Sequence, residues 1–179
     1  TVSLGIALIT TEAETDAIFT KSGENEVHLV SPGSISTSSN YSSGIYNSGS
    51  NNLVTASGNI STTGEWATGI KNIGSDNITD LSGSITTEED NAYGIWNRGN
   101  SNITTVSGSI TTGDVVEGTG NNAYGIYNDG AFSMTTVSGS ITTEGEDSTG
   151  IYNYGSGSTT TLTSTGVITV NGATTDGIY

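Results

Sequence analysis

Isoleucine returns along this chain at a nearly fixed spacing, and that pattern organises the whole sequence. In one set, each isoleucine follows Gly or Ala and precedes an aromatic residue or Lys, at intervals of 27, 25, 25, 31, 25 and 27 residues. The members of this set are Ile18, Ile45, Ile70, Ile95, Ile126, Ile151 and Ile178. A fixed period of about 20–50 residues is typical of stacked repeats, because one unit cannot bury its apolar face alone.

A second set of isoleucines follows nearly the same spacing and divides each repeat into short strands. Its members are Ile9, Ile35, Ile60, Ile85, Ile110, Ile141 and Ile168. Residues 103–106, 109–112 and 124–128 form three β-favouring runs separated by Gly-containing bends, with no helical period. The pattern predicts an all-β fold, a right-handed parallel β-helix (β-solenoid) of about seven coils of roughly 25 residues, with three short strands per coil. We expect residues 1–179 to form a single domain, a segment or protomer of a longer rod.

Alternation along each strand predicts which side chains point inward. Val106 and Ile110 share one parity, so we expect both in the core. In the Gly-Ile strand we expect Ile95 to point inward, Trp96 to point outward, and Asn97 to point inward or to lie at the corner. We also expect an inward column from the remaining strand of each coil, formed by Val27, Leu53, Ile78, Ile103 and Met134. The interval of 31 residues indicates an insertion at residues 113–120, and insertions in solenoids go to loops, often on the binding side.

An asparagine follows the Gly-Ile phrase in most repeats. Stacked Asn side chains can hydrogen-bond to each other along the axis of such a sheet, so the pattern predicts a structural ladder. An Asn-lined ligand site is the less favoured alternative. The ladder residues are Asn47, Asn72, Asn97, Asn128 and Asn153.

An aromatic residue stands between the isoleucine and the asparagine in most repeats. Rings about 4.8 Å apart can stack and stabilise a sheet face, and a row of exposed rings can also be a contact surface for sugars or another rod. Both interpretations stay open. The candidate contact residues are Phe19, Tyr46, Trp96, Tyr127, Tyr152 and Tyr179.

Acidic residues gather between the Ile-Thr-Thr and Gly-Ile phrases, where stacking would crowd them along one edge. Calcium would relieve that repulsion, since it takes six to eight oxygen ligands. We favour a solvated edge, because neither an EF-hand loop nor the calcium-binding nonapeptide occurs. We therefore expect no cofactor, with calcium as an alternative. The candidate metal ligands are Glu88, Glu89, Asp90, Glu144, Glu146 and Asp147.

Charge and composition bear on the partners. The net charge is −15, with Lys21, Lys71 and Arg98 as the basic residues, which disfavours nucleic acid and anionic lipid. No stretch has the length of a membrane span, so we expect no direct membrane insertion. The single histidine, His28, has no partner phrase for a triad or a zinc site. Without a recognisable catalytic arrangement, we expect no enzymatic activity.

Two phrases, residues 106–112 (Val-Ser-Gly-Ser-Ile-Thr-Thr) and residues 123–128 (Ala-Tyr-Gly-Ile-Tyr-Asn), resemble the passenger repeats of bacterial autotransporter adhesins. Such repeats run along the whole chain. The resemblance implies a β-helical protein secreted by Gram-negative cells, displayed outside them and used for adhesion or self-association. The membrane barrel of that family does not occur in this sequence, and no catalytic residue is carried over.

The sequence thus predicts a non-enzymatic structural and adhesive module located outside the cell or on its surface. It would act through repeated contacts with host or matrix glycans or proteins, without nucleic acid. A self-assembling subunit stacked end to end into an extracellular filament is the alternative, because open sheet edges invite pairing. A β-helix enzyme that degrades polysaccharides is the remaining hypothesis.

Overall fold

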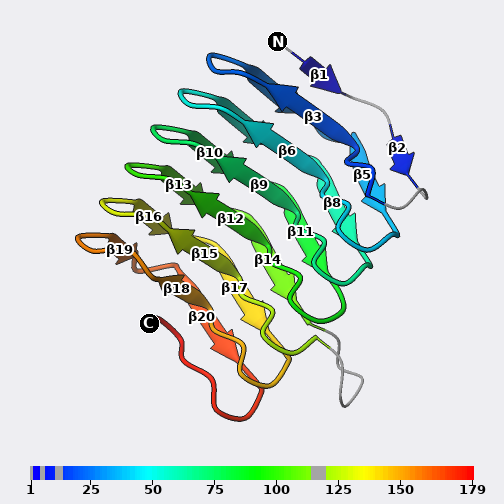
Figure 1. Ribbon diagram of the computed structural model, residues 1–179. Helices are drawn as coiled ribbons and strands as arrows, with labels where there is room; N and C mark the ends of the chain where they lie inside the picture. Colours follow the sequence, from blue (N-terminus) through cyan, green and yellow to red (C-terminus); the bar gives the residue numbers. More distant parts are fainter. Residues whose placement is uncertain (1, 5–6, 11–13, 114–119) are drawn as a thin grey trace.

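The computed structural model describes residues 2–4, 7–10, 14–113 and 120–179 and consists of parallel strands stacked in coils (Figure 1). Each of the first six coils contributes one strand to each of three sheets, and the last coil contributes a strand to two of them. The two ends of the chain lie at opposite ends of the stack (Figure 1). The predicted β-solenoid with three short strands per coil is confirmed. The described residues contain no helix, and their strands make two seven-stranded sheets and one six-stranded sheet, about six complete turns.

Three sheets run along the stack, and all named strand pairs in them are parallel. The first sheet contains β1 (Val2–Leu4), β4 (Glu26–Leu29), β7 (Leu53–Ala56), β10 (Ile78–Leu81), β13 (Ile103–Val106), β16 (Met134–Val137) and β19 (Thr159–Leu162). The second contains β2 (Ala7–Thr10), β5 (Ser34–Thr37), β8 (Asn59–Thr62), β11 (Ser84–Thr87), β14 (Ser109–Thr112), β17 (Ser140–Thr143) and β20 (Val167–Val170). The third contains β3 (Ile18–Lys21), β6 (Ile45–Ser48), β9 (Ile70–Ile73), β12 (Ile95–Arg98), β15 (Ile126–Asp129) and β18 (Ile151–Asn153).

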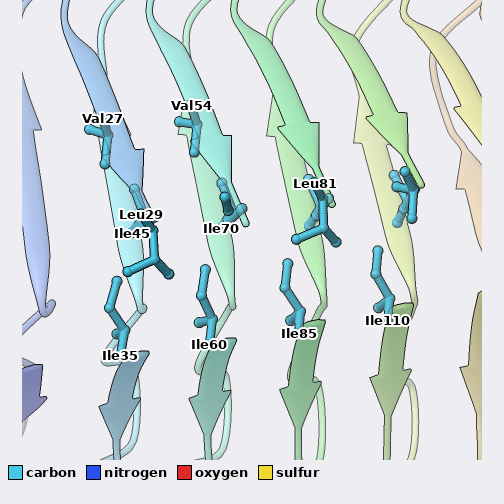
Figure 2. Close-up of a cluster of buried hydrophobic side chains, with 14 of the residues drawn as sticks. Val27, Leu29, Ile35, Ile45, Val54, Ile60, Ile70, Leu81, Ile85 and Ile110 are labelled. Atoms are coloured by element: carbon cyan, nitrogen blue, oxygen red, sulfur yellow. The ribbon is translucent and has the colours of Figure 1, made fainter. Parts of the chain in front are cut away.

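The register places equivalent residues of successive coils beside each other. Ile85 pairs with Ile60 on one side and Ile110 on the other, and Ile95 pairs with Ile70 and Ile126. Figure 2 shows one set of these isoleucines, one per coil, facing the valines and leucines of the first sheet. Each apolar side chain is therefore buried by its own coil and by both neighbours. The chain builds a continuous core in this way although 31% of its residues are apolar.

The glycine before each of these isoleucines allows a close approach between strands. A Cβ placed on Gly94 would lie 2.4 Å from Ile110 Cγ2 and 2.5 Å from the carbonyl oxygen of Gly125. Both distances are far below van der Waals contact, so a side chain here would push neighbouring coils apart. The same crowding recurs at Gly69 and Gly125, which explains why the Gly-Ile phrase repeats.

One predicted inward column is wrong for four of its five residues. Val27 is buried, but Leu53 is half-buried, and Ile78, Ile103 and Met134 are exposed on the outer face of the first sheet. The inward positions of these strands are Val54, Thr79, Thr104 and Thr135, all buried. The reason is the pleat: Leu81 and Val106 point inward at the end of their strands, so residues three positions earlier must point outward.

The first coil departs from the predicted register by one residue. β2 pairs with β5 so that Leu8, not Ile9, is opposite Ile35, and Ile9 is opposite Ser36. The second set of repeat positions therefore begins at residue 8. Its first interval is 27 residues, equal to the first interval of the Gly-Ile set.

Candidate contact surface and the buried asparagine ladder

The asparagines that follow the Gly-Ile phrase form a hydrogen-bonded column inside the coils. The side-chain Nδ2 of Asn47 donates to Oδ1 of Asn72 at 2.9 Å, and the same bond joins Asn72 to Asn97, Asn97 to Asn128 and Asn128 to Asn153. The first four side chains are buried and that of Asn153 is half-buried. The bond from Asn97 to Asn128 crosses the long interval of 31 residues with the same length as the others.

Threonines of the first sheet accept the second hydrogen of most of these amides. Nδ2 of Asn72, Asn97 and Asn128 donates to the hydroxyl of the threonine seven residues later, at 2.9, 2.9 and 3.1 Å. The threonines are Thr79, Thr104 and Thr135. Because a buried amide without partners destabilises a fold, the threonines are as much part of the ladder as the asparagines. Each amide is engaged within the fold, which leaves the Asn-lined ligand site without support from the contacts.

A second asparagine column supports the turn after the third sheet, and our sequence analysis missed it. Oδ1 of Asn77 accepts the backbone N–H of Asn52, and Oδ1 of Asn102 accepts that of Asn77, both at 2.9 Å. Each of these side chains also donates to a turn carbonyl of its own coil, Asn77 to Gly74 and Asn102 to Gly99. The sequence does contain a signal for this second column: an Asn stands just before the first-sheet strand in consecutive repeats.

The candidate contact residues lie on the outer face of the third sheet, in one column. Phe19 pairs with Tyr46, Trp96 with Tyr127 and Tyr127 with Tyr152 in the strand register. Tyr152 and Tyr179 stack with ring centroids 4.8 Å apart and planes inclined by 6°, and Trp96 and Tyr127 stack at 6.1 Å and 21°. Phe19 and Tyr179 are exposed, at 54% and 63%, and the residues between them are half-buried.

Two tyrosines outside the predicted column turn it into a double row. Tyr93 and Tyr124 precede the glycine of their phrases and stack at 5.4 Å and 7°, and Tyr124 stacks on Tyr152 at 5.1 Å and 8°. Both also meet Tyr127 edge to face. Burial raises the pKa of Tyr93 to about 12. Burial and the nearby charge of Asp129 raise the pKa of Tyr127 to about 12 as well.

Lys71 occupies the aromatic column in the coil between Tyr46 and Trp96. Its ammonium lies 5.1 Å from the Tyr46 ring centroid and 4.6 Å from that of Trp96, a double cation–π contact. Burial lowers the pKa of Lys71, and the charge of Asp16 opposes that shift. Burial likewise raises the pKa of Asp16, whose carboxylate accepts the Ser43 N–H at 2.7 Å. The column is thus continuous: Lys71 joins Tyr46 to Trp96 by cation–π contacts, and ring-to-ring contacts join the other members.

The stacking limits what this surface can bind. Where rings lie face to face, as in Tyr93 to Tyr124 and Tyr152 to Tyr179, their faces are covered by other rings of the column. Ring edges and phenol hydroxyls remain for a partner. A sugar that stacks on a ring face would therefore find such a face chiefly at Phe19 or Tyr179, the exposed ends of the column.

The acidic residues lie in the turns between the second and third sheets, as the repeat pattern predicts. Among the candidate metal ligands, Asp90 accepts the Asn121 N–H at 2.8 Å, Glu144 accepts the Asn171 amide at 2.9 Å, and Asp147 accepts the Thr174 hydroxyl. Within the described ranges, no three His, Cys, Asp or Glu side chains are grouped as metal ligands would be. Glu12, Asp114 and Glu117, which belong to the same acidic set, lie outside the described residues.

His28 lies on the outer face of the first sheet, away from these turns. Its Nδ1 is 2.5 Å from the Thr55 hydroxyl and its Nε2 is 3.6 Å from a carboxylate oxygen of Glu26. The Thr55 contact extends the cross-strand pairing of β4 with β7. These contacts account for the one histidine of the chain as part of a sheet surface.

Comparison of the chain with models of protein families, with curated proteins and with solved structures gives no match. In the part of the chain that the structure describes, no helix is long and apolar enough to cross a bilayer.

Proposed function

We propose that this protein is a non-enzymatic structural and adhesive module of a microbial surface protein, located outside the cell. The rod would act mechanically, by presenting the same weak contact once per coil. A partner that engages several coils at once gains a high effective concentration at each further contact, so weak single contacts add up to firm attachment.

The observation that carries the proposal is the outer column of the third sheet. Every described strand of that sheet places an aromatic ring or Lys71 at the same register position. Buried ladder residues keep this spacing constant. Half-exposed Tyr and Trp are common in protein contact surfaces, since one side chain supplies both apolar area and a hydrogen-bonding group. A regular row of such groups suits a repetitive partner such as a polysaccharide, a matrix fibre or a second rod.

An attachment assay tests this proposal. Beads coated with purified protein are passed over a panel of immobilised glycans and matrix proteins, and their retention under flow is measured. We expect retention on at least one surface, and a loss for the double variant Tyr46→Ser with Tyr152→Ser. Tyr154→Ser is the matched control, because Tyr154 is 70% exposed but is not in the column. No retention on any surface, or equal retention of the folded double variant, would count against the adhesive role.

The finer assignment to an autotransporter passenger rests on the repeated phrases and the repeat length. The gene on either side of this segment tests it, since a passenger is expected to be followed by a region encoding an outer-membrane barrel. The absence of catalysis is tested separately, by incubation with a panel of polysaccharides. If the protein released reducing ends from a polysaccharide, and a Glu-to-Gln variant did not, the result would instead favour the enzyme hypothesis.

A self-assembling filament subunit is the second candidate, favoured by the surface of the last coil. Leu162 and Ile178 pair in register with Val137 and Ile151, which are buried, but they are themselves 44% and 47% exposed. That surface suits a further coil, whether of the same chain or of a second molecule. Electron microscopy of concentrated protein distinguishes the cases: filaments with an axial repeat of one rod length are expected for self-assembly, and separate short rods would contradict it.

A further inference from the structure

Two exposed aromatic residues occupy equivalent positions at the acidic edge, on turns of neighbouring coils. Tyr41 and Trp66 lie between the second-sheet and third-sheet strands of their coils, and the Tyr41 N–H donates to the Glu65 carbonyl at 2.9 Å. Tyr41 is 58% exposed and Trp66 is 46% exposed. Among the described residues, neither ring takes part in the stacking and cation–π contacts of the third-sheet column.

The backbone at these two positions is one that aromatic residues adopt rarely. The equivalent residue has a positive φ in every coil, +64° at Tyr41 and +60° at Trp66. Asparagine fills the position in the next two coils, at Asn91 and Asn122, and it tolerates this conformation better than aromatic residues do. An aromatic side chain that is exposed and unstacked gives the fold little in return. Fold stability therefore does not account for Tyr41 and Trp66, which points to a partner outside the chain.

Acidic residues occupy the same turns and the turns next to them. Glu14 occupies the same turn position in the preceding coil, Glu65 directly precedes Trp66, and Glu89 and Asp90 lie in the turn of the next coil. The basic residues lie elsewhere: Lys21 and Lys71 are on third-sheet strands, and Arg98 is 3.9 Å from Asp129. With a net charge of −15, the field at this edge favours the approach of a cation.

The chain itself shows how such groups hold a cation. Lys71 lies between Tyr46 and Trp96, one ring from each flanking coil, and the Asp16 carboxylate adds a favourable charge interaction. Tyr41 and Trp66 likewise come from adjacent coils and have acidic residues in the same and neighbouring turns, but the cation–π contacts of the described chain do not involve their rings. Arginine suits such a surface best, because its guanidinium stacks on aromatic rings and pairs with carboxylates.

We propose that the Tyr41–Trp66 turns, with Glu14, Glu65, Glu89 and Asp90, bind an arginine-rich or lysine-rich segment of a partner protein. The rings provide cation–π contacts and the carboxylates pair with the charges. This surface lies apart from the aromatic column of the third sheet, so the inference holds whether or not that column mediates adhesion.

Fluorescence anisotropy with a labelled peptide of alternating Arg and Gly tests the proposal, at physiological salt, where non-specific attraction is screened. We expect the peptide to bind the unmodified protein, and the same peptide with citrulline in place of arginine to bind at least about tenfold more weakly. The double variant Tyr41→Asn with Trp66→Asn should raise the Kd for the arginine peptide about tenfold. Its fold should persist, because asparagine suits this backbone; a far-ultraviolet circular dichroism spectrum checks this.

Phe132→Asn is the matched control. Phe132 is also an exposed aromatic residue with a positive φ, +59° and 64% exposed, but it lies in the turn before the first sheet. Its variant should bind the arginine peptide like the unmodified protein. Equal binding by the double variant, an equal loss for Phe132→Asn, or equal affinity for the citrulline peptide would each overturn the proposal. If the double variant fails to fold, the comparison of the two peptides on the unmodified protein still decides whether a cation is recognised.

Discussion

Two columns of side chains run along the third sheet, and their members are adjacent residues on each strand. On β12, Trp96 points outward and is half-buried, whereas Asn97 points inward and is fully buried. The inner column holds asparagine in five successive coils, while the outer column of the same coils holds tyrosine, lysine, tryptophan, tyrosine and tyrosine. An inner amide needs a hydrogen-bonding side chain in the coil above and in the coil below, and asparagine supplies both a donor and an acceptor. An outer side chain has only to pack against a ring or an aliphatic chain in the next coil. Several residue types can therefore occupy the outer column.

The largest expected effect comes from breaking the inner column. Asn97→Leu removes one amide and takes one buried hydrogen bond from each of Asn72, Asn128 and Thr104. Buried unsatisfied groups cost about 1–3 kcal/mol each, so we expect the free energy of unfolding to fall by about 3 kcal/mol or more. Urea denaturation measures it. Asn153→Leu, at the half-buried end of the ladder, should cost about 1 kcal/mol; equal losses for the two variants would mean that the ladder bonds contribute little.

Breaking the outer column should cost less. Tyr127 contacts the rings of Trp96, Tyr93, Tyr124 and Tyr152, so Tyr127→Ala removes several aromatic contacts at once. We expect a loss of about 2 kcal/mol in the same urea measurement. Tyr154→Ala is the control, because that ring is 70% exposed, and it should change stability by less than about 0.5 kcal/mol. A loss for Tyr127→Ala as small as the control would show that the stack is not stabilising.

Two opposite substitutions test the hydrogen bonds between the asparagines of the inner column and the threonines of the first sheet. Asn47 lacks the threonine partner that the later asparagines have, because Val54 takes that position. Thr104→Val should leave the second Asn97 N–H unpaired and lower stability by about 1 kcal/mol. Val54→Thr should supply the missing acceptor and raise stability by a few tenths of a kcal/mol, up to about 1. Thermal melting compares them, and the same sign of change for both would contradict the assigned pairing.

The smallest effect concerns pH and the outer column. Burial raises the pKa of Tyr93 and Tyr127 from 10.0 to about 12. An unfolded chain loses these protons first, so their contribution to stability is complete below pH 10 and falls as the pH rises through 12. We expect alkaline unfolding in this range, less steep for the double variant Tyr93→Phe with Tyr127→Phe. Denaturant titrations at several alkaline pH values measure it, and an unchanged pH dependence would argue against buried phenols.

The sequence predicted the parts of the fold that follow from the period. Equal intervals between isoleucines predicted stacked coils, and the alternation along the strand predicted the inner side of Ile95 and the outer side of Trp96 correctly. For Asn97 the sequence left the interior and the corner as alternatives, and the structure shows it buried inside. The prediction from the sequence was wrong for Ile78 and Ile103. We expected an apolar core and therefore assigned the apolar residue of each strand to the interior. The buried residues there are Thr79 and Thr104, which are acceptable inside only because asparagine side chains donate to them.

The candidate contact column could be predicted residue by residue, but its chemistry could not. Stacking distances and the place of Lys71 between two rings depend on side-chain rotamers, which a repeat pattern does not contain. Tyr93 and Tyr124 were overlooked because they occur in only two repeats. Tyr41 and Trp66 were overlooked because their distinguishing feature is a backbone conformation, visible only when the turns of several coils are compared.

The coil that contains the extra residues shows how such a protein can change in length. β14 and β17 pair in the usual register before the insertion, and β12 and β15 do so after it. Length is therefore absorbed within a single turn and is not passed on to later coils. Mutation can therefore lengthen or shorten one turn of one coil. The strands of every other coil keep their register. Such a design lets a protein of stacked coils vary the turns on its exterior without having to evolve a new fold.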